Sequence, residues 1–266
     1  MKNNLHRPLA PISDAAWKQI DDEARDTFAL RAAGRRVVDV PPAGGPALGS
    51  IDLGHLDAPN VDGGVELRLF QTQPLVRVRV PFTVSRQDVD DVERGALDLG
   101  WDEVNDAVAK LVDVEDRAIL HGWPEAGIVG LTGASPHTPV QMPAELAQID
   151  DAISVACNTL RLADIEGPYD LVLPQALYTA VAETTNYGRP VVEHLRQLLS
   201  GGEVLWAPAA ESALVVSRRG GDASLYLGRD ASIGYLSHDA ETVTLYLEES
   251  FTVRVHEPDA AVALLR

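Results

Sequence analysis

Histidine and cysteine are the side chains of this sequence that a zinc site would most often use. Zinc sites on helices use ligands three or four residues apart, because that spacing places both on one face. The single cysteine, Cys157, lies on the apolar stripe of a predicted helix, which indicates a small buried side chain rather than a nucleophile. We predict no metal site, because the required spacing is absent among the seven histidines His6, His55, His121, His137, His194, His238 and His256.

Motifs for nucleophilic or phosphate chemistry are also missing. The glycine-rich stretch 130–135 (GLTGAS) lacks the Gly-Lys-Ser/Thr ending of a phosphate-binding loop. The sequence has no Gly-x-Ser-x-Gly turn, which carries the nucleophile of many hydrolases. Ser135 and His137 could be drawn into a triad with a distant carboxylate, but such trios can be drawn in most chains of this size. We therefore predict that the protein is not an enzyme and has no catalytic residues.

The charge of the chain argues against two classes of partner. The 266 residues carry 22 Lys and Arg against 40 Asp and Glu, a formal net charge of −18. Binding to nucleic acid or to anionic lipid depends on clustered basic residues, so we expect neither partner. No segment approaches the roughly 20 apolar residues of a membrane helix, and residues 1–8 lack the apolar core of a secretory signal. We expect a cytoplasmic protein.

Apolar periodicity predicts several long helices that would form the framework. The first begins after Ser13, carries Trp17, Ile20 and Phe28 on one face, and ends near Gly34. Further helices are predicted over 101–122, 143–162, 175–183 and 191–199. Strands are predicted over 37–40, 169–173, 204–206, 214–217, 225–227, 242–247 and 251–255. Helices and strands without strict alternation indicate an α+β fold.

A period of two residues dominates the region after Gly64. Apolar and polar side chains alternate over 64–70 and again over 76–84, where Arg77 and Arg79 lie on the polar side. We predict that these two runs pair as a long hairpin arm. A two-stranded ribbon is at best marginally stable alone in water. Its apolar face therefore needs a covering surface in this chain or in a neighbouring one, which points to a protein whose work is assembly.

Six short blocks in a fixed order resemble one known family, the encapsulin shell proteins, also called linocin/bacteriocin-like proteins. Each block is weak alone, but together they span nearly the whole chain. They are 34–40 (GRRVVDV), 90–95 (DDVERG), 165–169 (IEGPY), 219–222 (RGGD), 227–235 (LGRDASIGY) and 248–252 (EESFT).

The resemblance implies the HK97-like major capsid fold of tailed phages, divided into peripheral and axial domains and an extended loop. The implied peripheral domain takes 1–50, with a helix facing the lumen, 83–124, with a spine helix, and the strands of 219–266. The extended loop would be 51–82 and the axial domain 125–218. Such chains form a T=1 icosahedral shell of about 60 subunits, a closed assembly of one chain. The shell encloses cargo enzymes, such as a dye-decolourising peroxidase or a ferritin-like protein, through their C-terminal targeting peptides.

The resemblance also implies two sites. Apolar side chains of a cargo tail would pack against Phe28, Val37 and Ile233, while Arg35 and Asp39 would fix its direction through charge-assisted hydrogen bonds. The implied cargo-peptide groove consists of Phe28, Arg35, Val37, Asp39, Asp230, Ile233 and Tyr235. The implied fivefold pore consists of Thr184, Thr185, Asn186, Tyr187, Gly188 and Arg189.

The resemblance also bears on a flavin cofactor. Some encapsulins stack a flavin on an aromatic residue just before the acidic block, where this chain has Gln87, so no flavin is expected.

Two alternative functions are open. A phage-type major capsid protein would share the fold, although the negative charge disfavours packing of nucleic acid. A peptidase or bacteriocin is the weaker alternative, because no nucleophile–base pair supports it.

Overall fold

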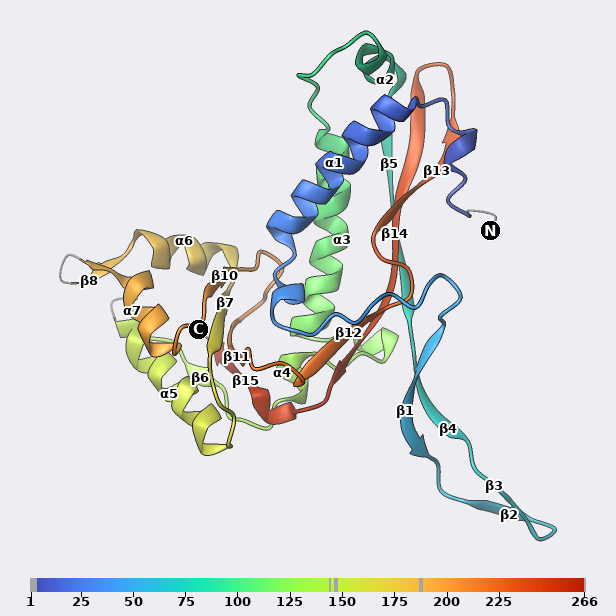
Figure 1. Ribbon diagram of the computed structural model, residues 1–266. Coiled ribbons are helices and arrows are strands. Elements are labelled where there is room, and N and C mark those ends of the chain that lie inside the picture. The colour runs from blue at the N-terminus through green and yellow to red at the C-terminus, as the bar shows by residue number, and fades with distance from the viewer. Residues whose placement is uncertain (1–3, 144, 146–147, 187–188, 266) are drawn as a thin grey trace.

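The computed structural model of the protein describes residues 4–143, 145, 148–186 and 189–265. Figure 1 shows three parts: long helices against a long sheet, a smaller sheet surrounded by helices, and a thin arm that projects from the first part. The α+β class predicted from the sequence is confirmed.

Two helices form the framework of the first part. Helix α1 (Asp14–Arg31) begins at Ser13, whose hydroxyl accepts a hydrogen bond from the Ala16 N–H. It packs against α3 (Asp102–Leu120), as the apolar stripes of both helices predicted. The turn after α1 continues into the 3₁₀ helix η2 (Gly34–Arg36), where a Cβ on Gly34 would lie 2.7 Å from the Ile119 side chain. Only glycine lets this turn lie so close to α3.

Strand β14 (Thr242–Val255) is the centre of the first sheet. It pairs with β5 (Val76–Ser85) along one edge, and with β13 (Ser232–His238) and β12 (Ala223–Leu227) along the other. The sequence predicted two separate strands over 242–247 and 251–255. Residues 248–250 join them, because Glu248 and Glu249 are buried with charged partners and so do not interrupt the strand.

The predicted pairing of 64–70 with 76–84 is wrong. The arm pairs β1 (Ser50–Leu56) with β4 (Phe70–Pro74), and its tip pairs β2 (Asn60–Asp62) with β3 (Val65–Leu67). β5 pairs with β14 along its whole length instead, because Phe82 and Val84 are buried in the core against α3. The alternating pattern of β5 identified a strand but not its partner. The predicted extended loop, 51–82, thus contains nearly all of the arm and most of β5.

The second part is a five-stranded sheet covered by helices. Its order is β10-β7-β11-β15-β6, and buried aliphatic side chains join it to the helices. Cys157 is buried here, as expected. The strands are β6 (Val140–Gln141), β7 (Tyr169–Leu173), β10 (Val204–Trp206), β11 (Ala213–Ser217) and β15 (Ala261–Leu265), and the helices are α5 (Ile149–Leu162), α6 (Gln175–Glu183) and α7 (Val191–Leu198).

Five sequence-based assignments differ from the structure. The helix expected from residue 143 begins at Ile149, and helix α2 (Arg86–Glu93) and strands β13 and β15 were not predicted. The strand expected at 37–40 is a single bridge, since only Asp39 exchanges backbone hydrogen bonds with β12. The short elements are η1 (Arg7–Leu9), η3 (Pro124–Ala126), α4 (Leu131–Ala134), β8 (Thr185–Asn186), β9 (Arg189–Pro190) and η5 (Pro258–Ala260).

Candidate functional site

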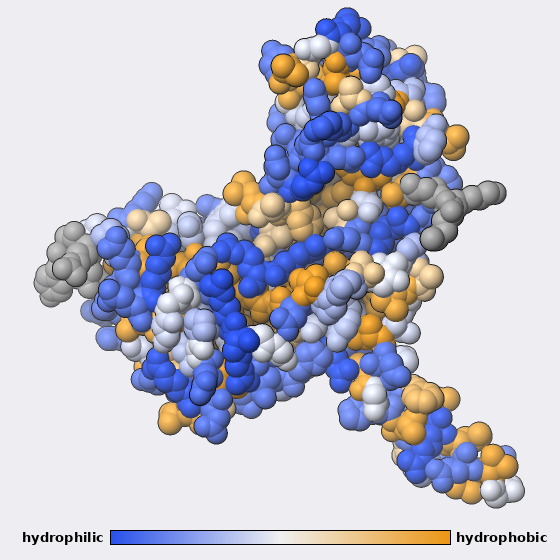
Figure 2. Space-filling model, in the orientation of Figure 1, coloured by the Kyte–Doolittle hydropathy of each residue, from blue (hydrophilic) through white to orange (hydrophobic). Residues whose placement is uncertain are grey.

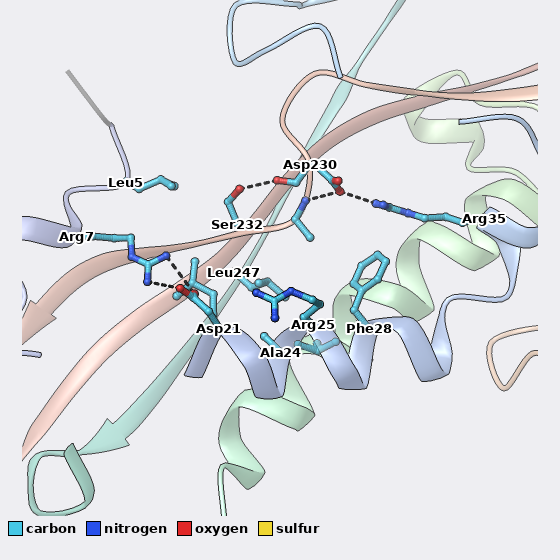
Figure 3. A pocket seen from close by; sticks show the side chains of 13 residues that line it. Leu5, Arg7, Asp21, Ala24, Arg25, Phe28, Arg35, Asp230, Ser232 and Leu247 are labelled. Atoms are coloured by element: carbon cyan, nitrogen blue, oxygen red, sulfur yellow. Dashed lines mark hydrogen bonds and ion pairs between the residues drawn. The ribbon is translucent and has the colours of Figure 1, made fainter. Parts of the chain in front are cut away.

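A cavity of about 410 Å³ lies between α1, β13 and the loop that precedes β13. The structure brings four of the seven predicted groove residues together on its wall: Phe28, Arg35, Asp230 and Ile233. Figure 3 shows Phe28 and Arg35 near Asp230, and Arg7 with Asp21 farther along the cavity. We call this cavity the groove. Its other lining residues are Leu5, Arg7, Asp21, Ala24, Arg25, Val108, Ala231, Ser232 and Leu247.

The other three predicted residues lie beside the groove. Val37 is buried in the core under β12, and Asp39 accepts a hydrogen bond of 2.7 Å from the Gly221 N–H. The Tyr235 hydroxyl lies 2.6 Å from Nδ1 of His238, and its ring packs at the edge of the core of the first part. None of these three is among the described residues that line the cavity.

Sequence reasoning missed most of the wall, although part of it carried a signal. Asp21, Ala24, Arg25 and Phe28 have the i, i+3, i+4, i+7 spacing of one helical face, so an expectation at Phe28 could have been extended to its neighbours. Leu5 and the loop residues follow no such period. Their place in the wall is decided by the path of the backbone.

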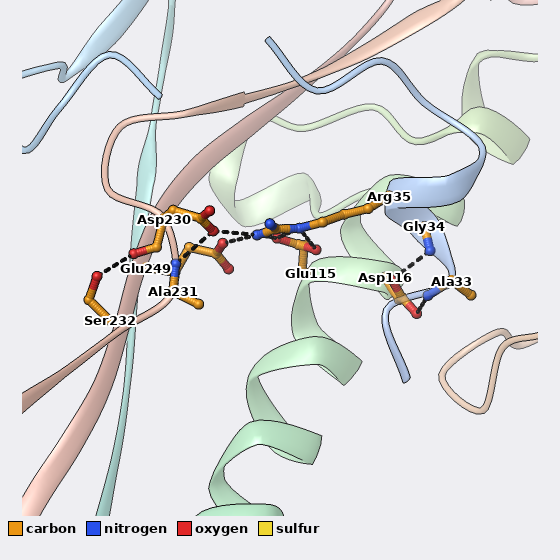
Figure 4. A network of polar contacts seen from close by, with 9 residues as sticks. All are labelled: Ala33, Gly34, Arg35, Glu115, Asp116, Asp230, Ala231, Ser232 and Glu249. Carbon is orange, nitrogen blue, oxygen red and sulfur yellow. Dashed lines mark hydrogen bonds and ion pairs between the residues drawn. The ribbon is translucent and has the colours of Figure 1, made fainter. Parts of the chain in front are cut away.

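Arg35 is the centre of a network of buried carboxylates, drawn in Figure 4. Its guanidinium donates to Glu115 at 2.8 to 3.1 Å, to Asp230 at 2.9 Å and to Glu249 at 2.5 Å. The carboxyl groups of Glu115 and Glu249 are fully buried, whereas the Asp230 side chain is 55% exposed. One side chain therefore ties η2 to α3, to β14 and to the loop before β13.

The network shifts the proton affinities of its members. Burial acts to lower the pKa of Arg35, but the hydrogen bonds and charge of Glu115 and the charge of Glu249 raise it overall. Burial, followed by the charge of Glu115, raises the pKa of Glu249 well above its usual value. Arg35 is thus held as a cation, and Glu249 is held toward its neutral form. Chain carboxylates already surround the arginine that was expected to bind the peptide.

A second buried carboxylate fixes the turn between α1 and η2. Asp116 accepts hydrogen bonds from the N–H groups of Ala33, at 3.1 Å, and Gly34, at 2.8 Å. Burial raises the pKa of Asp116 to about 7, against the opposing effect of these two bonds. Asp116 positions the turn that carries Arg35 to the groove.

Four of the predicted pore residues are described, and they follow α6 and lead through two short paired strands to α7. Thr185 and Asn186 pair with Pro190 and Arg189 through their backbones, and the Thr184 hydroxyl donates to the Ala180 carbonyl at 2.6 Å. Two further predicted pore residues, Tyr187 and Gly188, lie outside the described residues.

The hydroxyl of Ser135, considered above in a triad with His137, has another hydrogen-bond partner. The Ser135 hydroxyl donates to the Ala261 carbonyl at 2.6 Å, so its proton is not directed at His137. Within the described ranges, no three acidic, histidine or cysteine side chains gather as a metal site would require. In that same part of the chain, no helix combines the length and the apolar character needed to cross a bilayer.

Solved structures with the same fold define the class of protein. A virus-like particle from Pyrococcus furiosus matches with a TM-score of 0.64 at 15% identity, over 94% of this chain and 99% of its own. The capsid of Myoviridae phage XM1 matches with a TM-score of 0.54 at 13% identity, over 87% and 90%. The fold is the HK97-like fold of capsid-forming proteins.

Sequence relatives narrow the class further. Residues 1–252 match a family model described as encapsulating protein for peroxidase. Proteins named type 1 encapsulin shell protein from Mycolicibacterium paratuberculosis and Mycobacterium tuberculosis are 49% and 47% identical, each over 98% of this chain and 99% of their own length. One from Brevibacterium linens is 45% identical over the same shares. The chain belongs to the encapsulin shell protein family and is a structural protein, not a catalyst.

Proposed function

We propose that this protein assembles in the cytoplasm into a T=1 icosahedral shell of about 60 subunits that encloses a cargo enzyme. The arm carries this proposal. Its apolar side chains are exposed in the single chain, with Leu69 at 73% and Phe70 at 68%, and they appear as orange patches along the arm in Figure 2. Burying a side chain of this size stabilises by about 1.5–3 kcal/mol, and other copies of the chain would supply the cover.

Cargo capture is assigned to the groove. Its volume suits a few side chains of an extended peptide, and Phe28, Ile233 and Leu247 offer apolar surface to them. A contact of this size is weak by itself. An oligomeric cargo that presents several C-terminal tails to several grooves gains avidity, so a weak site is sufficient.

Charge at the two ends of the groove would orient the tail. Asp230 is half exposed and can accept a hydrogen bond from the peptide, while Arg35 is engaged by three carboxylates. The role expected for Arg35, direct bonding to the tail, is therefore transferred in this proposal to Asp230. Val37 and Asp39, which are not among the described lining residues, have no direct contact with the tail in this proposal.

The segment of Thr184, Thr185, Asn186 and Arg189 is proposed to surround a fivefold pore, together with Tyr187 and Gly188. A short polar segment between two helices suits a site where five copies meet and pass small solutes.

We also propose that the shell carries no flavin. Gln87 is an exposed residue of α2 and offers no aromatic face for stacking.

Shell formation and cargo capture have separate tests. Purified protein should elute in the megadalton range and form hollow particles in electron micrographs. A stable folded monomer at ordinary ionic strength would contradict the shell. DNA protected inside nuclease-treated particles would favour a phage-type capsid instead.

The groove is tested by filling it. Ala24→Trp places a large ring in the cavity, and Ala29→Trp makes the same change on the exposed face of the same helix. We expect shells of both variants, with loading of a tail-tagged peroxidase lost only in Ala24→Trp. Equal loading of the two variants would show that the groove is not the cargo site.

A further inference from the structure

The N-terminal residues 4–9, here called the strap, lie across one end of the groove. The Tyr235 N–H donates to the Leu5 carbonyl at 2.8 Å, and the Tyr246 hydroxyl donates to the Asn4 carbonyl at 3.3 Å. The Arg229 guanidinium donates to the side-chain oxygen of Asn4. Leu5 is buried and lines the groove, so the strap contributes an apolar wall as well as a backbone.

The strap is held over a glycine of β13. A Cβ on Gly234 would lie 2.2 Å from the ring of Tyr246, so that ring lies directly across the strand at this point. Arg79 stacks on the ring at 4.0 Å. The ring can reach Asn4 only because the residue beneath it has no side chain.

Arg7 fastens the strap to α1. Its guanidinium donates two hydrogen bonds to Asp21, of 3.1 and 2.7 Å, and lies 3.9 Å from the centre of the Trp17 ring. A bidentate pair of this kind has fixed geometry, and the partly buried stack on an indole adds to it. Figure 3 shows this pair at one end of the groove and Arg35 with Asp230 at the other.

We propose that Arg7 and Asp21 are positioning residues that hold the strap as the closed end of the groove. This inference rests on the proposed capture of an apolar peptide tail. The strap, with Leu5, then forms a preformed wall against which the tail packs, and the Arg35–Asp230 end is where the tail enters. Without the pair, the part of the strap around Arg7 would be loose in the free shell. It would then have to become ordered whenever a tail binds.

Breaking the pair is expected to weaken binding of the tail and to leave assembly of the shell unchanged. Ordering a loose segment on binding consumes part of the binding free energy, and preorganisation avoids that loss. We expect roughly a ten-fold weaker capture of the tail when the pair is broken, because the loosened strap must then be ordered on binding.

The test uses two carboxylates of one helix. Asp21→Asn and Arg7→Gln each break the pair, and Asp26→Asn removes the same charge from an exposed residue of α1 that does not line the groove. Shells are reassembled with increasing concentrations of a fluorescent protein that carries the C-terminal tail of a cargo peroxidase. The concentration at half-loading is then compared between variants.

The inference predicts a roughly ten-fold higher half-loading concentration for Asp21→Asn and for Arg7→Gln, and no change for Asp26→Asn. The double variant should be no worse than either single one, because both act through one contact. Equal half-loading concentrations for Asp21→Asn and Asp26→Asn would overturn the inference. Additive losses in the double variant would also overturn it, because they would show that each side chain touches the tail by itself.

A second measurement needs no cargo. Amide hydrogen exchange at Tyr235 reports the bond to Leu5, and we expect it to be faster in Asp21→Asn shells than in Asp26→Asn shells. Unchanged exchange would refute the role of the pair in holding the strap. If the parent shell loads no tail at all while Tyr235 exchange responds as expected, the proposed cargo site fails and the strap itself stands.

Discussion

Arg35 and Glu115 are joined by three hydrogen bonds, of 2.8, 2.9 and 3.1 Å, across the contact between η2 and α3. Glu115 is fully buried, and Glu249 shares the same arginine. The single guanidinium therefore ties together buried side chains of α3 and β14, two elements that are far apart in the chain. The groove wall at Asp230 is fixed by the same contact.

Removing Arg35 should be strongly destabilising. Arg35→Met leaves Glu115 and Glu249 buried without their cation, and breaking a buried pair in this way costs about 3–5 kcal/mol. We expect a lower melting temperature and poor shell yield, measured by differential scanning calorimetry and size-exclusion chromatography. Arg36→Met is the control, because Arg36 makes an exposed pair with Glu203. Similar losses for the two variants would contradict the structural importance of the network.

Asp116 should make stability depend on pH. Its pKa of about 7 in the folded chain lies above the ordinary value of 3.8, so the folded state holds the extra proton between these values. The stabilisation from this retained proton is fully present below about pH 4 and is lost as pH rises through 7. The free energy of unfolding then falls by up to a few kcal/mol.

The variant Asp116→Asn isolates that contribution, because it cannot titrate. We expect the melting temperature of the parent relative to Asp116→Asn to fall between pH 4.5 and 8. The amide keeps one acceptor oxygen for the N–H groups of Ala33 and Gly34, so the turn is retained in part. Parallel pH profiles for the two proteins would show that Asp116 is not protonated in the folded state.

The arm should be needed for assembly but not for folding. Phe70→Ser removes an exposed apolar ring of β4, while Gln71→Ser changes the next residue, which is already polar. We expect Phe70→Ser to shift the population from shells to free subunits of unchanged circular dichroism, by analytical ultracentrifugation. Intact Phe70→Ser shells would show that the arm's apolar face contributes little to contacts between copies.

Cys157 should be chemically inert in the folded protein. Burial raises the pKa of its thiol to about 11, so the reactive thiolate is scarce at neutral pH. We expect no labelling by Ellman's reagent until denaturant unfolds the second part, and then one thiol per chain. Rapid labelling of intact shells would contradict the burial.

Local pattern was sufficient for much of the framework. The apolar stripes of α1 and α3 are set by helical spacing, which depends on the backbone geometry of the helix alone. Glu115 stands on the stripe of α3, an unusual position for a charged residue that already hints at a buried partner. The sequence does not reveal that the partner is Arg35, because the two residues meet only after the chain has folded back.

Pairing and enclosure were decided by the tertiary structure. The alternation in 76–85 fits any neighbouring strand, and its pairing with β14 followed from the burial of Phe82 and Val84 against α3. The sequence by itself determined the two long framework helices α1 and α3, the class of fold and, through its short blocks, the family. Only the folded chain brought Leu5 and Arg7 to the groove, because contacts between distant segments depend on the path of the whole backbone and leave no periodic signal in either segment.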